Sequence, residues 1–155
     1  FNQGGYDEIA LAAAAHFAAE RTLVATKGAV GTPPGSRQSF YVVPADDTYT
    51  KPIVLLTSDA TASAAEALTL AMRALPNVTH AGSSTRGAFS DVLIQVLPNG
   101  WMMTLSNEVY RDATGELWEG RGIHPEEPFA MFSDGDLNGH FEAIHELVMQ
   151  LQDGL

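Results

Sequence analysis

The region around Ser63 places the tightest constraint on how this chain can fold. The apolar run over residues 53–56 predicts a buried strand, and a helical pattern begins near Glu66. The residues between them are too small to cover the Ser63 side chain, so its hydroxyl is expected to be exposed. The free N–H groups of the first helical turn would lie beside that hydroxyl, ready to stabilise an anion. The local sequence leaves two interpretations open: Thr61 or Ser63 caps the helix, or Ser63 is a nucleophile.

Composition limits the classes of protein to which this chain can belong. Its 155 residues make one domain, which can bury roughly 68–70% of its unfolded surface. A formal net charge of −11 argues against nucleic acid and anionic membrane surfaces as partners. The absence of cysteine excludes disulfides, thiolate catalysis and cysteine-ligated zinc. No apolar run approaches the ~20 residues of a membrane span, so we expect no membrane insertion by this segment.

The hydrophobic pattern predicts an α/β fold with a mixed sheet. Helices are expected at 6–21, 64–75 and 139–152, and strands at 22–26, 39–44, 53–56, 78–82, 92–97 and 101–105. The last two strands are joined by turn residues and should form a hairpin, whereas residues 111–122 are expected to form an irregular loop. Helices and strands alternate early in the chain and strands cluster later, which is typical of an α/β domain with a mixed sheet.

The N-terminal residues suggest that the chain is part of a longer protein. It begins at Phe1, without methionine and without a signal-like segment. Residues 1–5 have the composition of a turn after a strand, yet no strand precedes them. We therefore expect the 155 residues to be a fragment that lacks its first strand.

Six short segments occur in an order and spacing that resemble one family. They are residues 2–5 (NQGG), 61–66 (TASAAE), 82–90 (GSSTRGAFS), 97–100 (LPNG), 106–108 (SNE) and 119–126 (EGRGIHPE). In this order they resemble the catalytic domain of the tricorn-core and C-terminal processing serine peptidases. The resemblance covers nearly the whole chain.

This resemblance implies a fold, an activity, partners and a cellular location. The fold is the ββα superhelix shared with ClpP and crotonase, and the activity is that of a serine endopeptidase acting on a peptide or protein without a cofactor or metal. The family's domain is preceded by further N-terminal segments, so the N-terminal part of the same protein is an expected partner, and an oligomer is compatible with the family. Exported bacterial relatives imply a periplasmic, envelope or secreted location.

The same resemblance assigns roles to individual residues. The family's nucleophile lies three residues before the glutamate of its motif, which corresponds to Ser63 in this chain. The oxyanion hole would combine the backbone N–H of Ala64 with that of Gly4 or Gly5, because glycine lets the backbone approach a substrate oxygen. By sequence alone, Gly4 and Gly5 could equally form an ordinary turn.

The general base distinguishes two branches of the family. C-terminal processing peptidases use a lysine about 25 residues after the serine, where this chain has Ala88, and its two lysines, Lys27 and Lys51, lie elsewhere. Arg86 cannot replace that lysine, because a guanidinium does not deprotonate in proteins. The tricorn-like branch uses a histidine from the N-terminal part of the protein instead.

In that branch a glutamate after the hairpin orients the histidine, and Glu108 corresponds to it. The carboxylate would fix the imidazole tautomer and stabilise its charge. The resemblance thus implies a Ser–His–Glu site whose histidine lies upstream of Phe1. The alternative interpretation is that Glu108 is a solvated carboxylate at a strand end.

Other residues offer weaker alternatives. Among the chain's own histidines, His80 is the candidate local base, and the others are expected to be packed or on the surface: His16, His124, His140 and His145. Residues 134–139 match the first half of a calcium loop, but His145 stands where its glutamate ligand belongs, and helix capping explains the same residues. We therefore expect no metal.

The sequence suggests only a few residues that could recognise the substrate. Four apolar residues would either line a pocket beside Ser63 or belong to the strand core: Phe89, Leu93, Trp101 and Met103. Arg86 would bind the C-terminal carboxylate of a substrate, because arginine binds carboxylates with two parallel hydrogen bonds. Two further readings stay open: a non-catalytic peptide-binding or scaffolding domain on the same fold, and, less favoured, an acyl-CoA enzyme of the crotonase type.

Overall fold

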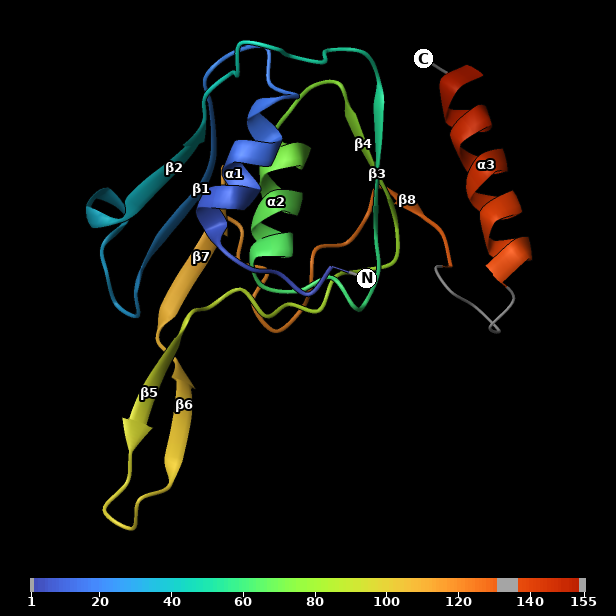
Figure 1. Cartoon of the computed structure of the whole chain (residues 1–155). Coiled ribbons are helices and arrows are strands. Elements are labelled where there is room, and N and C mark those ends of the chain that lie inside the picture. Colours follow the sequence, from blue (N-terminus) through green and yellow to red (C-terminus); the bar gives the residue numbers. More distant parts are fainter. Residues whose placement is uncertain (1, 131–136, 154–155) are drawn as a thin grey trace.

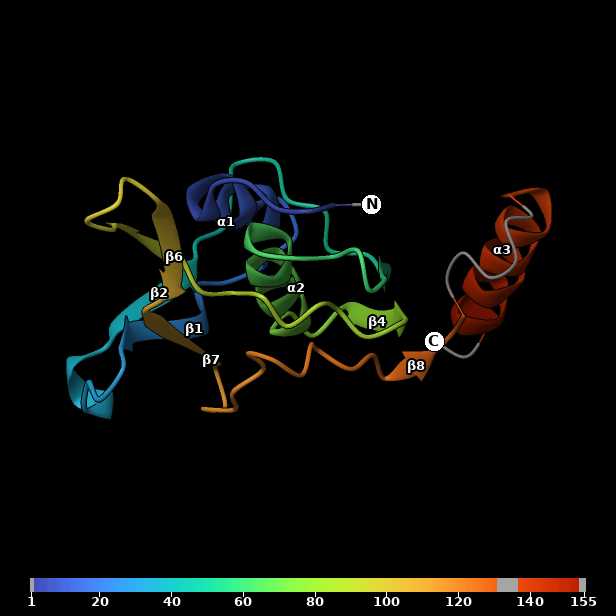
Figure 2. The ribbon, with the colours of Figure 1, turned by 90° about the horizontal axis from the view of Figure 1, so that it is seen from below.

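Two helices form the centre of the fold. A computed structural model describes residues 2–130 and 137–153. In it α1 (Asp7–Ala15) and α2 (Ala64–Arg73) pack against each other with one sheet on either side (Figures 1 and 2). Alanine recurs in both helices, which favours helix formation and lets the two backbones approach closely. Ala14 and Ala71 are fully buried in the resulting core.

The first sheet is antiparallel, with strand order β2-β1-β7. It consists of β1 (Thr22–Ala29), β2 (Gln38–Val42) and β7 (Glu108–Asp112), and a short 3₁₀ helix, η1 (Pro34–Ser36), lies between β1 and β2. The central strand β1 is longer than expected because it pairs with strands on both sides. β7 was not expected, since its two apolar residues are adjacent in sequence and give no alternating pattern.

The second sheet is parallel, with strand order β3-β4-β8. It consists of β3 (Ile53–Thr57), β4 (Val78–Gly82) and β8 (Glu127–Pro128), and α2 is the crossover from β3 to β4. Residues 53–56 were expected to be buried but are half-buried, because β3 is the outer strand in this order. The structure thus has both parallel and antiparallel strand pairs, and the mixed α/β class is confirmed.

Two elements lie outside this central unit (Figures 1 and 2). β5 (Val92–Val96) and β6 (Met102–Ser106) form the expected hairpin, which projects from the body with every strand residue exposed. α3 (Leu137–Asp153) follows β8 in the chain. None of the helices in the described parts of the chain has the length and apolarity needed to cross a membrane.

The first helix ends earlier than the sequence suggests. The sequence pattern predicts a helix to about residue 21, but α1 ends at Ala15. The reason is tertiary: the carbonyl oxygens of Ala15 and His16 accept backbone hydrogen bonds from Ala45 and Tyr49, at 3.0 and 2.7 Å. A distant loop therefore satisfies the end of the helix, without a glycine or proline stop.

His80, the alternative base, is fully buried in β4. Its Nε2 lies 2.7 Å from Thr57 Oγ1, and the Thr57 hydroxyl donates to the Ser83 carbonyl oxygen at 2.7 Å. Because that hydroxyl has one proton, Nε2 must be the donor, which leaves Nδ1 unprotonated and, among the described residues, without a partner. Burial, reinforced by the positive charge of Arg73, lowers the pKa of His80 to about 4. The imidazole contacts Thr57 and not Ser63.

We expect this buried imidazole to make the fold sensitive to acid. As pH falls from 6.5 to about 4, the unfolded chain takes up a proton at His80 that the folded protein excludes, so stability is lost across that window. The loss amounts to at most about 3 kcal/mol. His80→Gln keeps an N–H donor for Thr57 but cannot titrate. Between neutral and acidic pH, we therefore expect the free energy of unfolding of this variant to change less than that of the wild type, as measured by urea denaturation. His145→Gln, at an exposed histidine, is the control; equal pH dependence in wild type and His80→Gln would contradict the assignment.

Candidate active site

Ser63 occupies a strained turn between β3 and α2. Its backbone has φ 58° and ψ −131°, and it is the sole non-glycine residue at positive φ in the described parts of the chain. Such a conformation costs on the order of 1–3 kcal/mol and is typical of functional sites. A sharp strand-to-helix turn of this kind presents a serine hydroxyl in hydrolases. No sequence signal indicated the strain.

Ser63 is the N-cap residue of α2. Ser63 and Glu66 stand in the arrangement of a capping box, and the Ser63 N–H donates to Glu66 Oε2 at 3.2 Å. The Glu66 N–H bonds to the Ser63 carbonyl oxygen at 2.7 Å. This geometry is compatible with both interpretations of Ser63, as an N-cap residue and as a nucleophile.

The fully buried Glu66 fastens the loop after β4 to the serine turn. Its Oε1 accepts from Thr85 Oγ1 at 2.5 Å and from the Gly87 N–H at 2.6 Å, and its Oε2 accepts from the Ala88 N–H at 2.8 Å. The Ala88 carbonyl oxygen in turn accepts the Ser63 N–H at 2.9 Å. Sequence reasoning used Glu66 only to locate the nucleophile and missed this supporting role.

The N-terminal segment lies directly over the serine turn. Gly4 has φ +101°, and a Cβ built on it would lie 2.7 Å from both Ser63 Cβ and the Ala62 carbonyl oxygen. The Ala62 N–H donates to the Asn2 carbonyl oxygen at 3.2 Å and ties the two segments together. Only a residue without a side chain fits at this position.

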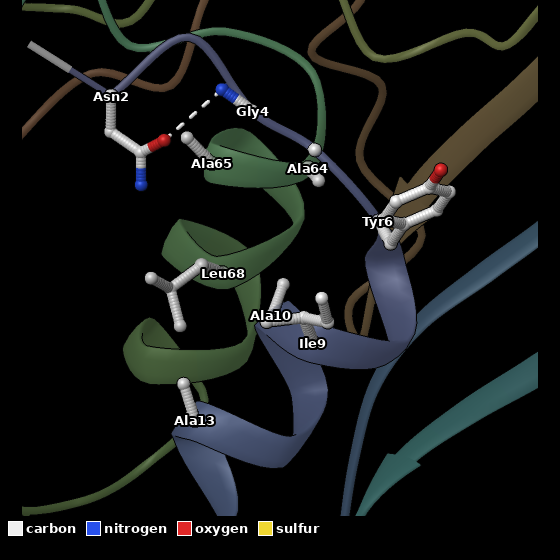
Figure 3. Close-up of a pocket in the computed structure, with 10 residues that line it drawn as sticks. Asn2, Gly4, Tyr6, Ile9, Ala10, Ala13, Ala64, Ala65 and Leu68 are labelled. Atoms are coloured by element: carbon white, nitrogen blue, oxygen red, sulfur yellow. Dashed lines mark hydrogen bonds between the residues drawn. The ribbon is translucent and has the colours of Figure 1, made fainter.

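Three backbone N–H groups in the segments around Ser63 differ in what they bind. The Gly4 N–H donates to Asn2 Oδ1 at 3.1 Å, the dashed line in Figure 3. Within the part of the chain that the structure describes, the N–H groups of Gly5 and Ala64 have no hydrogen-bond partner. Backbone N–H groups without a partner are the type of donor that an oxyanion site uses.

Glu108 begins β7 and is half-buried beside Lys27, whose Nζ lies 2.9 Å from Glu108 Oε2 and 2.8 Å from Asp91 Oδ2. Burial alone would lower the pKa of the Lys27 ammonium, but hydrogen bonds, the strongest to Asp91, hold it above its ordinary value. Lys27 therefore remains protonated and is unsuited to act as a base. The Ser90 hydroxyl accepts the Glu108 N–H at 3.1 Å and links β7 to the loop that contacts Ser63.

The residues considered for substrate recognition lie in different environments. Arg86 is exposed, with its Nε donating to the Asp59 carbonyl oxygen at 3.1 Å. Phe89 is only 4% exposed and packs against Tyr110 in the core, a placement that favours a structural role. Three other apolar residues were expected either beside Ser63 or in the strand core: Leu93, Trp101 and Met103. All three are exposed, because they lie on the hairpin or its turn.

The remaining predictions concern the other histidines and a metal site. His140, expected at the surface, is buried against Phe129 with ring centroids 6.3 Å apart, and His124 is exposed with its Nδ1 2.7 Å from Ser84 Oγ. The calcium-like segment 134–139 lies mostly outside the described residues. Within residues 2–130 and 137–153, no cluster of three or more His, Asp or Glu side chains could hold a metal ion.

A serine at a strained strand-to-helix turn on a mixed α/β fold is an arrangement that serine hydrolases use. The model of peptidase family S41 matches residues 1–129, and the chain belongs to that family. The expected relationship to C-terminal processing peptidases is confirmed at this level, whereas the tricorn-like branch stays a prediction.

Solved structures agree with this family and its fold. A candidate peptidase from Parabacteroides merdae superposes with a TM-score of 0.84 at 27% identity, covering 97% of this chain and 49% of that one. Mature CPAF gives a TM-score of 0.80 at 15% identity, covering 99% and 43%. The photosystem II D1 C-terminal processing protease gives 0.65 at 21% identity, covering 90% and 35%. The chain thus spans about half or less of these proteins, and comparison with proteins of curated function gives no match.

The two neighbouring glycines provide a matched test of the site geometry. Gly4→Ala would place a Cβ within 2.7 Å of Ser63 Cβ at a positive φ, whereas Gly5→Ala meets nothing within 4 Å. We expect Gly4→Ala to lower the free energy of unfolding by on the order of 2–4 kcal/mol and Gly5→Ala to change it by about 0.5 kcal/mol or less. Urea denaturation measures both values. Equal effects of the two substitutions would show that the N-terminal segment does not pack on the serine turn.

Proposed function

We propose that this chain carries the nucleophile and the oxyanion site of a tricorn-like serine endopeptidase that needs no cofactor or metal. The observation that carries the proposal is the strained turn that Ser63 occupies between β3 and α2, with the unpartnered backbone N–H groups of Gly5 and Ala64 in the adjoining segments. Membership in peptidase family S41 supports the same reaction class.

In the proposed reaction Ser63 Oγ attacks the carbonyl carbon of a peptide bond. The oxygen becomes negatively charged as the tetrahedral intermediate forms, and the N–H of Ala64 stabilises it together with that of Gly4 or Gly5. Gly5 offers a free donor, whereas the Gly4 donor would first have to leave the Asn2 side chain. Loss of one donor of this type typically lowers kcat by about 10²–10³.

The general base in this proposal is a histidine outside residues 1–155, oriented by Glu108. An imidazole takes the Ser63 proton and later gives it to the leaving amine, and a carboxylate stabilises the imidazolium between these steps. Lys27 Nζ lies 2.9 Å from Glu108 Oε2, and in this proposal the imidazole N–H donates to the Glu108 carboxylate. With both Lys27 and His80 unsuited to the role, we expect these 155 residues alone to have little or no peptidase activity.

A fluorophosphonate probe tests the nucleophile on the complete protein that contains this domain. We expect labelling in the wild type, no labelling in Ser63→Ala, and full labelling in Ser39→Ala, which removes an exposed serine on β2. A folded, complete protein that is not labelled would support the non-catalytic alternative. Robust hydrolysis by the isolated 155 residues, abolished by Ser63→Ala, would overturn the external histidine.

The role of Glu108 has its own test in the pH profile of kcat/KM. Glu108→Gln removes the negative charge beside the imidazole, so the acid limb should move to lower pH while kcat falls by roughly 10²–10⁴. Glu142→Gln, at an exposed position on α3, should change neither quantity. An unchanged acid limb in Glu108→Gln would assign the orienting carboxylate elsewhere.

A further inference from the structure

An apolar groove opens between α1 and α2, immediately beside the candidate oxyanion site. It has a volume of about 290 Å³ and includes Gly5 and Ala64 in its lining (Figure 3). Ala65 and Leu68 line it from α2, and Ile9 lines it from α1. The unpartnered N–H groups of Gly5 and Ala64 therefore belong to residues that border a largely apolar cavity, whose lining also includes Asn2.

The composition of the groove points to an uncharged occupant. None of its lining residues carries a charge, although the chain as a whole has a net charge of −11. Tyr6 and Ile9 are 74% and 66% exposed at its edge, in and next to a helix that otherwise consists largely of alanine. Large exposed apolar side chains gathered around a concavity are typical of a binding site.

Covalent geometry connects this groove to the reacting bond. A carbonyl oxygen held by the Ala64 N–H places its carbon close by, and the side chain on the acyl side is only two bonds from that carbon. The groove begins at the same residues, so that side chain is the part of a peptide that can enter it. A charged side chain would be buried there without a partner, which is unfavourable.

We propose that the groove between α1 and α2 is the specificity pocket for the residue whose carbonyl is attacked, and that it accepts apolar side chains such as leucine, methionine or phenylalanine. This inference rests on the proposed peptidase function. Ala65 and the buried Ala10 give the pocket its depth, because a larger residue at either position would fill it. Ile9 sets the polarity of its mouth.

A charge placed at Ile9 tests this assignment in the complete protein. Two peptides that differ only in leucine or glutamate at the attacked residue give a ratio of kcat/KM values, which we expect to favour leucine by at least about 10-fold. Ile9→Lys offers the glutamate a partner, so the ratio should fall by about 10-fold or more. Val30→Lys adds the same charge at another exposed apolar residue and should leave the ratio unchanged.

The outcomes separate this inference from the proposed function. A leucine/glutamate ratio that is the same in wild type and Ile9→Lys, with hydrolysis still abolished by Ser63→Ala, would overturn the pocket and leave the peptidase intact. Ile9→Asp with a lysine-containing peptide repeats the test with opposite charges if Ile9→Lys fails to fold. A wild type that neither reacts with fluorophosphonate nor cleaves peptides would overturn the peptidase, and the pocket with it.

Discussion

A single buried carboxylate holds the candidate site together. Glu66 is fully buried in the first turn of α2, where a carboxylate is stable only if it is well supplied with donors. It accepts hydrogen bonds from Ser63, Thr85, Gly87 and Ala88. Bonds to a carboxylate are among the stronger ones in proteins, and the positive end of the helix dipole adds to them. The serine turn and the loop after β4 are thereby fixed to the same helix.

A second layer of backbone supports that loop. Thr85 exchanges hydrogen bonds with Ile123, and the Gly120 N–H donates to the Gly87 carbonyl oxygen at 2.7 Å. A Cβ on Gly122 would lie 1.9 Å from the Thr85 carbonyl oxygen, so the glycines of segment 119–122 allow two backbones to touch. The strained conformation at Ser63 is thus held through contacts that extend to distant parts of the chain.

Sequence reasoning reached the fold class, the family and the position of the serine turn. It succeeded where the signal is local: the period of α2, the turn residues of the hairpin, and the small residues around Ser63. It missed β7 and the early end of α1, because a partner strand and a distant loop determine them and leave no local pattern. The functions of Glu66 and Lys27 were missed for the same reason, since each depends on contacts with residues remote in the sequence.

The projecting hairpin has a consequence for how the molecule behaves in concentrated solution. From Val92 to Ser106 there is no charged side chain, the strands present exposed apolar residues, and in the described part of the chain the two strands pair only with each other. Strand edges without a partner pair readily with other strands. A net charge of −11 keeps copies of the chain apart while ionic strength is low. Added salt reduces the range of that repulsion to about 10 Å or less, so a higher salt concentration favours contacts between the hairpins of different copies.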